Sequence, residues 1–207
     1  MVKNKIVKSK VNRRKQILEA AEEVLLSDGL SGVTTRQISR AAGCSEGALY
    51  VHFASRLELL LAMLEERLPV LLEPLQALQQ SIGSGSPHSN LASALEGIFR
   101  FHQRVLPLVA GLFADPALHA AYRESLARQG KGPQLSLKVL EDYIAAEQKL
   151  GRLDNQVDAK IAAHLLMSAS FLSVFNEQFF RMRMRQKWPA FVRQVITVIV
   201  PDTGCSN

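Results

Sequence analysis

The stretch from Thr34 to Phe53, TTRQISRAAGCSEGALYVHF, decides the fold of the N-terminal part of the chain. Thr34 is a favourable helix N-cap, and Gln37 three residues later completes a capping-box pattern. Gly43 marks the end of this first short helix. A residue just past a helix often needs a positive φ, which glycine adopts without steric cost.

A second helix begins after Ser45, because its hydroxyl suits the N-cap position. Leu49 and Phe53 are four residues apart and therefore share one face of this helix. Two helices joined by a glycine turn are the pattern of a helix-turn-helix, whose second helix enters the major groove of DNA. A plain helical hairpin shows the same bare pattern, so only a wider match distinguishes the two.

Residues 16–60 supply that wider match, because they resemble the DNA-binding domain of the TetR family of bacterial transcriptional regulators. The resemblance runs in register through Ile17-Leu18-x-Ala20, Gly29, Thr34-Thr35-Arg36-x-Ile38, Ala42-Gly43-Cys44-Ser45-x-Gly47-x-Leu49-Tyr50-x-His52-Phe53 and Arg56-x-x-Leu59-Leu60. It implies an all-α fold of about nine helices. An N-terminal three-helix helix-turn-helix domain would be followed by a larger helical domain for ligand binding and dimerisation. Beyond the N-terminal quarter to third, the chain resembles the family only in helical character and length.

The resemblance divides the chain into three parts. Residues 1–12 are expected to be a basic flexible arm, and residues 13–56 the DNA-binding domain, with its motif at about 34–53. Residues 57–207 are expected to form the effector-binding and dimerisation domain. The arm is inferred because residues 1–15 contain seven Lys or Arg and no acid, and segments of like charge are often disordered. It is either a solubilising tail or an arm that follows the phosphate backbone or enters the minor groove.

The positive charge is concentrated in the N-terminal part. Residues 1–56 contain ten Lys or Arg and five Asp or Glu, whereas residues 57–207 contain fifteen and fourteen. The basic excess therefore lies with the predicted helix-turn-helix. It indicates a polyanion partner, which the resemblance identifies as double-stranded DNA.

Composition argues against several other classes of protein. Only two cysteines, Cys44 and Cys205, are present, so neither a disulfide framework nor metal-ligand spacing is expected. The N-terminus lacks the apolar core of a signal peptide, and the apolar run near residues 192–200 is too short to span a bilayer. The expected location is the bacterial cytoplasm, without membrane association. No Gly-rich phosphate loop, GxSxG elbow or HExxH motif occurs, so no enzyme activity, cofactor or metal is expected.

The helix-turn-helix geometry and the resemblance select the residues expected to contact DNA. The N-terminal residues of the second helix face base edges, and Arg36 reaches a phosphate or a guanine edge. In the family, the positions of five of these residues commonly meet the phosphate backbone: Thr35, Ser45, Tyr50, His52 and Arg56. The complete expected set is Thr35, Arg36, Ser45, Glu46, Gly47, Ala48, Tyr50, His52 and Arg56.

Some of these residues also have other possible roles. Glu46 either accepts a hydrogen bond from a cytosine amino group or only caps its own helix, and capping is the favoured role. Tyr50 and His52 either contact DNA or pack against the preceding long helix with their polar ends in water. Cys44 is expected to be buried as a small apolar residue.

Prolines and glycines divide the C-terminal part of the chain. Pro69 and Pro74 indicate a kink or break after the fourth helix. Residues 83–89, GSGSPHS, form the clearest loop. Pro107 and Pro116 bracket LVAGLFA, which is expected to be a separate short helix.

Two apolar helices late in the chain, at about 157–180 and 189–200, exceed what one small domain needs. Ile161, Leu165 and Leu172 lie on one stripe of the first, with Phe175 and Phe179. In the family, the corresponding pair packs against its two-fold mate as a four-helix dimer interface. A homodimer through these helices is therefore expected, and an ordinary internal core is the alternative.

A small, apolar effector is expected to bind in the C-terminal domain. Its pocket would be mainly apolar with a few polar groups. Residues chosen from helix faces for this role are Phe101, His102, Phe113, Tyr122, His164, Ser168 and Asn176. The alternative for the histidines is an ordinary place in the core.

The sequence thus predicts a TetR-type transcriptional regulator, most simply a repressor. It would bind a palindromic operator as a dimer and be released by a small-molecule effector. The alternative is a TetR-like architectural or protein-interaction module in which DNA binding is secondary.

Overall fold

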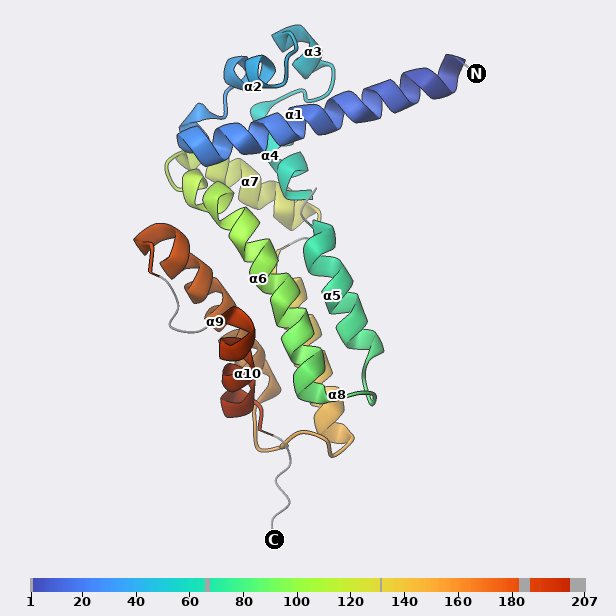
Figure 1. The fold of residues 1–207 in the computed structure, drawn as a ribbon, viewed down its shortest axis with the longest axis vertical. Coiled ribbons are helices and arrows are strands. Elements are labelled where there is room, and N and C mark those ends of the chain that lie inside the picture. Colours follow the sequence, from blue (N-terminus) through green and yellow to red (C-terminus); the bar gives the residue numbers. More distant parts are fainter. Residues whose placement is uncertain (1, 66–67, 131, 183–186, 202–207) are drawn as a thin grey trace. The chain divides into compact units, whose positions relative to one another are not determined.

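The computed structural model describes residues 2–65, 68–130, 132–182 and 187–201, and these residues form ten α-helices without a strand (Figure 1). The all-α prediction is confirmed, with ten helices where about nine were expected. The chain divides into two compact units. Unit 1 comprises Met1–Arg67 and Val105–Ser125, and unit 2 comprises Leu68–Arg104 and Leu126–Asn207.

Unit 1 contains the helix-turn-helix. Its helices are α1 (Val2–Gly32), α2 (Thr35–Ala41), α3 (Glu46–Tyr50) and α4 (Arg56–Glu65), with the C-terminal end of α6 (Pro87–Leu112) and most of α7 (Pro116–Arg128). Helix α1 packs against α2 and α4, and α2 packs against α3. One apolar stripe of α1 is buried, and it consists of Ile17, Ala21, Val24 and Leu25.

Helix α1 starts earlier than the sequence predicted. It begins at Val2, whereas a flexible arm had been expected over residues 1–12. Neither proline nor glycine occurs in residues 2–28, so nothing in the backbone stops the helix from extending towards the N-terminus. Gly29 interrupts α1 with φ 70° and ψ −174°, which confirms the predicted helix break at this glycine.

Unit 2 is built from α5 (Leu68–Gln80), the N-terminal part of α6, α8 (Pro133–Lys149), α9 (Ala159–Phe180) and α10 (Trp188–Ile199). Helix α8 packs against α5 and α9, and α9 packs against α10. The rings of Phe99 and Trp188 stack with their centroids 4.1 Å apart, which joins α6 to α10. The large, fully buried side chains of this unit include Leu78, Leu91, Leu95, Ile98 and Tyr143.

Prolines interrupt the helices less than predicted. Helix α4 ends at Glu65 and α5 begins at Leu68, and residues 66–67 between them lie outside the described part of the chain. Pro69 is the second residue of α5, where its missing N–H would have no helical partner in any case. However, Pro107 lies inside α6, so the separate short helix expected after it is wrong. Val105 and Leu108 on either side of Pro107 are buried. Their burial offsets the lost backbone hydrogen bond, which alone costs about 3 kcal/mol.

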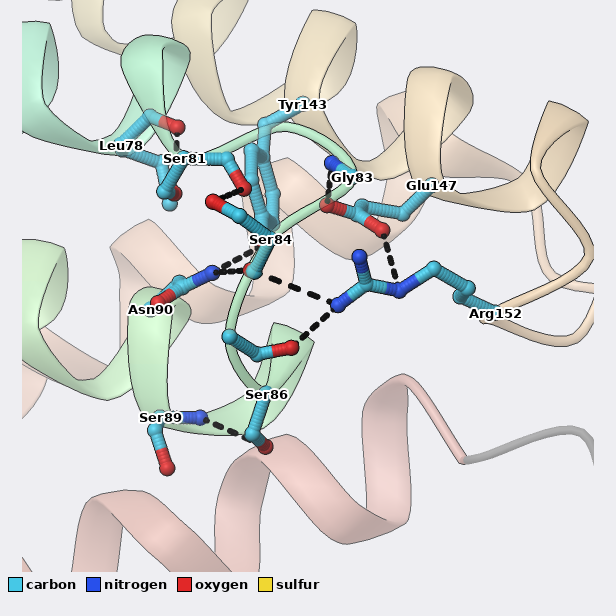
Figure 2. A network of polar contacts seen from close by, with 11 residues as sticks. Leu78, Ser81, Gly83, Ser84, Ser86, Ser89, Asn90, Tyr143, Glu147 and Arg152 are labelled. Carbon is cyan, nitrogen blue, oxygen red and sulfur yellow. Dashed lines mark hydrogen bonds and ion pairs between the residues drawn. The ribbon is translucent and has the colours of Figure 1, made fainter.

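The loop between α5 and α6 is fixed to α8 by a polar network around Glu147 (Figure 2). The Glu147 side chain is completely buried. Its Oε1 accepts a hydrogen bond from the Gly83 amide (3.0 Å), and its Oε2 lies 3.1 Å from Nε of Arg152. Arg152 also donates to the carbonyls of Ser84 and Gly85. A buried carboxylate is tolerated only when charge and hydrogen-bond partners compensate its lost hydration, as they do here.

Helices α5 and α6 approach each other at Gly97. A Cβ at this position would overlap the ring of Pro74 and lie 3.1 Å from the carbonyl oxygen of Val70. Both obstacles are rigid, since one is a proline ring inside a helix and the other is backbone. The close approach therefore depends on glycine having no side chain.

Replacing Gly97 by Val is expected to lower the free energy of unfolding by about 1–3 kcal/mol, because added volume in a packed contact forces strain. Ser93→Val is the matched control, because it introduces the same valine at an exposed position of the same helix, where no overlap arises. Urea unfolding followed by circular dichroism measures both. Equal stability of the two variants would show that α5 and α6 do not meet at Gly97.

Candidate nucleic-acid interface

The turn between α2 and α3 is a Schellman motif centred on Gly43. Gly43 has φ 60°, its amide donates to the carbonyl of Arg40 (3.2 Å), and the Cys44 amide donates to the carbonyl of Ser39 (2.9 Å). These two bonds satisfy carbonyl groups that the end of α2 leaves without helical partners. The predicted glycine turn with positive φ is confirmed.

Both predicted N-caps are present. The hydroxyl of Thr34 accepts from the Gln37 amide (3.2 Å), and the hydroxyl of Ser45 accepts from the Ala48 amide (3.1 Å). The Gln37 side chain differs from the capping-box pattern, because its Oε1 accepts from the Thr34 hydroxyl (2.9 Å). The Thr34 amide itself donates to the carbonyl of Gly32 (2.7 Å). Each short helix of the motif therefore begins at a hydroxyl residue that satisfies one of its first amides.

Helix α1 packs against the buried side of the helix-turn-helix. Leu49 and Phe53 are both buried, but α3 ends at Tyr50, so Phe53 lies beyond the helix on which the sequence placed it. The guanidinium carbon of Arg14 lies 4.9 Å from the centroid of the Phe53 ring, a cation–π geometry. Arg13 donates to the carbonyl of Ala42 at the end of α2, at 3.5 Å. Two basic residues of α1 thus contact the motif directly, in addition to its apolar stripe.

The residues predicted to contact DNA lie on the opposite side of α3 and at the start of α2 and α4. The Tyr50 side chain is 53% exposed, so its hydroxyl end is accessible. Ala48 and His52 are half-buried. Those with exposed side chains or backbone are Arg36, Ser45, Glu46, Gly47 and Tyr50, and those of intermediate exposure are Thr35, Ala48, His52 and Arg56. We call these nine residues the reading surface.

Glu46 is engaged differently from the two roles considered for it. Its Oε2 accepts a hydrogen bond from the hydroxyl of Thr35 at 3.0 Å, which links the first turns of α2 and α3. The N-cap bond of α3 belongs to Ser45 instead. A hydroxyl has one proton to donate, so Thr35 cannot donate to a phosphate while it is bonded to Glu46.

Arg56 also has an acidic partner within unit 1. It is the first residue of α4, whose N-terminus is capped by Ser55 through the Glu58 amide (3.1 Å). Its Nη1 lies 3.5 Å from Oδ2 of Asp115, and Oδ1 of Asp115 accepts from the Leu118 amide (3.0 Å) and caps α7. Sequence reasoning missed the ion pair, because the two residues are far apart in the chain and no local periodicity connects them.

The candidate effector residues are distributed over both units. In unit 2, Nδ1 of His102 lies 2.9 Å from Oγ of Ser170, and its ring meets that of Phe171 edge-on with centroids 5.7 Å apart. Burial lowers the pKa of His102 to about 4, so the imidazole is neutral at pH 7. Phe101 lies beside it, with ring centroids 6.3 Å apart.

The remaining effector candidates lie on α9 and in unit 1. On α9, His164 and Ser168 are exposed and Asn176 is half-buried. Phe113 and Tyr122 belong to unit 1, where Phe113 is exposed and burial raises the pKa of Tyr122 to about 12. Sequence reasoning missed Ser170 and Phe171, although their neighbours on α9 were considered.

Helix α9 has two apolar faces. One is buried in unit 2 and includes Ala162, Leu166 and Val174. The other is exposed, and its members are Ile161, Leu165, Leu172 and Phe179, with Phe180 and Met182 at the end of the helix. Among the described helices, α9 is by length and composition apolar enough to cross a membrane, a property that it shares with core helices of soluble proteins.

Known proteins resemble this chain most clearly in the helix-turn-helix region. Residues 17–63 match the family model described as "Bacterial regulatory proteins, tetR family". The HTH-type transcriptional regulator SrpR of Pseudomonas putida is 46% identical over 54 residues, which are 26% of this chain and 25% of that protein. The nucleoid occlusion factor SlmA of Vibrio cholerae is 42% identical over 57 residues, 27% of this chain and 29% of that protein. The alignments thus span less than a third of these two relatives.

Longer matches exist at lower identity. SlmA of Shewanella baltica is 26% identical over 159 residues, which are 68% of this chain and 81% of that protein. A crystal structure of a putative TetR-family regulator from Mesorhizobium loti superposes with a TM-score of 0.67 at 18% identity, covering 91% of this chain and 97% of that one. SmeT, the repressor of a multidrug efflux pump of Stenotrophomonas maltophilia, gives 0.64 at 22% identity, covering 90% of both chains. These structural likenesses establish the fold.

The left-handed turn at Gly43 is expected to need glycine or asparagine. A Cβ there would meet nothing within 4 Å, so the cost of a substitution is conformational rather than steric overlap with neighbours. Gly43→Val is expected to lower the free energy of unfolding by about 1–3 kcal/mol, because β-branched residues avoid positive φ. Gly43→Asn, which tolerates this region, is the matched control. Thermal unfolding and DNA binding measure both variants, and a valine variant as stable as the asparagine variant would contradict the assignment.

Proposed function

We propose that this protein is a transcriptional regulator that binds double-stranded DNA through its reading surface, because residues 17–63 match the family model of TetR-type bacterial regulatory proteins. The observation that carries the proposal is the helix-turn-helix itself, with buried Leu49 and Phe53 on one side and exposed polar residues on the other. The basic excess of residues 1–56 favours the same partner. This role places the protein in the bacterial cytoplasm.

In this proposal α3 lies in the major groove, with its N-terminal residues towards base edges. Gly47 and Ala48 are small and permit close approach, and the methyl group of Ala48 suits contact with a thymine methyl. Ser45, Tyr50 and His52 contact phosphates, which fix the position of α3 without reading sequence. Arg36, exposed at the start of α2, reaches a phosphate or a guanine edge.

We further propose a homodimer, which presents two copies of α3 to a palindromic operator. The exposed apolar face of α9 supports it, because a monomer that left Ile161, Leu165, Leu172 and Phe179 in water would expose a large apolar patch. Helix α10 packs beside α9 and also carries an exposed apolar residue, Val198, which is 81% exposed. Two reading helices in successive major grooves would be about 34–36 Å apart.

The regulatory part of the proposal is release from DNA by a small apolar effector, which makes the protein a repressor. His102, which is half-buried, and Ser170, which is buried, form a polar pair beside aromatic side chains of unit 2, and this is the kind of polar group that orients a ligand in an apolar site. An effector that weakens operator binding tenfold must bind the released state about 1.4 kcal/mol more tightly than the DNA-bound state.

The alternative is an architectural or protein-interaction role with secondary DNA binding. The match to the nucleoid occlusion factor SlmA favours it, since that match covers 68% of this chain and extends well beyond the helix-turn-helix. DNA binding belongs to both proposals. Sequence preference for an inverted repeat, followed by release with a small molecule, belongs to the first alone.

Tyr50→Phe is expected to weaken binding to every duplex by the same factor, because a contact to phosphate carries no information about base sequence. The loss of one hydrogen bond to a charged group is worth about 1.5–3 kcal/mol per contact, or roughly tenfold or more in affinity. Fluorescence anisotropy with several duplexes of different sequence measures the effect. A changed base preference would instead place the Tyr50 hydroxyl at a base edge.

Leu172→Asp is expected to convert the dimer to a monomer, since it would bury an unpaired carboxylate in each half of the interface at a cost of several kcal/mol per ion. Leu26→Asp is the matched control, because Leu26 is an exposed leucine of α1, 65% exposed compared with 56% for Leu172. Sedimentation equilibrium gives the mass of each variant. A Leu172→Asp dimer as stable as that of Leu26→Asp would exclude this face of α9 from the interface.

A further inference from the structure

Arg56 can form an ion pair with a DNA phosphate or with the carboxylate of Asp115. In the proposed DNA complex it meets a phosphate at the start of α4. In the free protein its Nη1 lies 3.5 Å from Oδ2 of Asp115, and both residues belong to unit 1. The two side chains are 35% and 38% exposed, so the pair lies at the surface where a phosphate can approach it.

Asp115 is the fixed member of this pair. Its Oδ1 accepts from the amide of Leu118, and its carbonyl accepts from the amide of His119, so it is held as the N-cap of α7. Only Oδ2 is directed at the guanidinium. Arg56 is the long, rotatable member, with four side-chain torsions between its backbone and its charge. The carboxylate therefore stays in place while the guanidinium can turn towards another anion.

We propose that Asp115 competes with DNA phosphate for Arg56, so that the N-cap of α7 lowers the DNA affinity of the reading surface. This inference rests on the proposed DNA binding and adds a residue that lies outside the helix-turn-helix. The negative charge of Asp115 withdraws the guanidinium from the position that a phosphate would occupy.

The competition is weak and reciprocal. A partly exposed ion pair at 3.5 Å contributes little, so its loss is expected to change affinity by about 2- to 5-fold per DNA-binding domain. DNA binding in turn weakens the hold of Asp115 on Arg56 by the same factor, as linkage requires. Occupancy of the operator is thereby coupled to the N-terminus of α7.

Asp115→Asn tests the proposal on the full-length protein. Asparagine caps helices as well as aspartate does, so the variant removes the charge and keeps α7 intact. We expect it to bind duplex DNA about 2- to 5-fold more tightly per domain than the unsubstituted protein. The slope of log K against log salt should become steeper by up to about 0.9 per Arg56 that gains a phosphate. Equal or weaker binding by Asp115→Asn, with an unchanged melting temperature, would overturn the proposal.

Two controls separate this pair from a general effect of charge. Glu23→Gln removes an exposed acid of α1 in the same unit, and it is expected to change affinity less than Asp115→Asn. In an Arg56→Gln background, Asp115→Asn should have no further effect beyond that of Glu23→Gln. If Asp115→Asn tightens binding equally with and without Arg56, the carboxylate acts through another group and the competition is refuted.

The test also distinguishes this inference from the function on which it rests. A phosphate contact is independent of sequence, so the Asp115 effect is measured on an arbitrary duplex as well as on a selected one. If Asp115→Asn tightens binding but the protein shows no sequence preference, the proposed operator binding is contradicted and the competition between Asp115 and phosphate is supported. If the protein selects a clear operator but Asp115→Asn has no effect, the competition is contradicted and the proposed regulator is supported.

Discussion

The left-handed turn at Gly43 is the constraint on which the reading surface depends. It closes α2 with two backbone hydrogen bonds, and the chain can then start α3 after only Cys44 and Ser45. Because the connection is so short, the direction of α3 is set by the end of α2. Burial of Leu49 and Phe53 then fixes the rotation of α3, with its exposed side away from the core. With a different turn, α2 and α3 could each still form, but α3 would point in another direction and the residues of the reading surface would not come together.

Intramolecular contacts at the reading surface occupy donors that DNA would use. The Thr35 hydroxyl is bonded to Glu46, and the Arg56 guanidinium is paired with Asp115. Each contact orders a side chain in the absence of DNA. Each must also be exchanged or shared when a phosphate arrives, so the affinity for DNA is a difference between two sets of contacts rather than a sum of new ones.

Local chemistry made the helix-turn-helix predictable from sequence. Caps at Thr34 and Ser45 and the positive φ of Gly43 depend on residues within a few positions of one another, and all three were predicted. Contacts between distant segments were not, as the Arg56–Asp115 pair and the His102–Ser170 pair show, because no periodicity relates their positions. Pro107 was misjudged for a related reason, since the burial that keeps α6 continuous is decided by tertiary packing. The start of α1 at Val2 was also not predicted, because the run of like charges indicated a flexible arm rather than a helix.

Selection of binding sequences from random duplex DNA, with purified protein at near-physiological salt, tests the central claim most directly. The proposed regulator should enrich a short inverted repeat. Its half-sites should be centred about one helical turn apart, roughly 10–10.5 base pairs, because two α3 helices related by a two-fold axis read successive major grooves. Binding that is sensitive to salt but enriches no sequence would contradict the claim. It would assign the DNA contact to charge alone and favour the architectural or protein-interaction role.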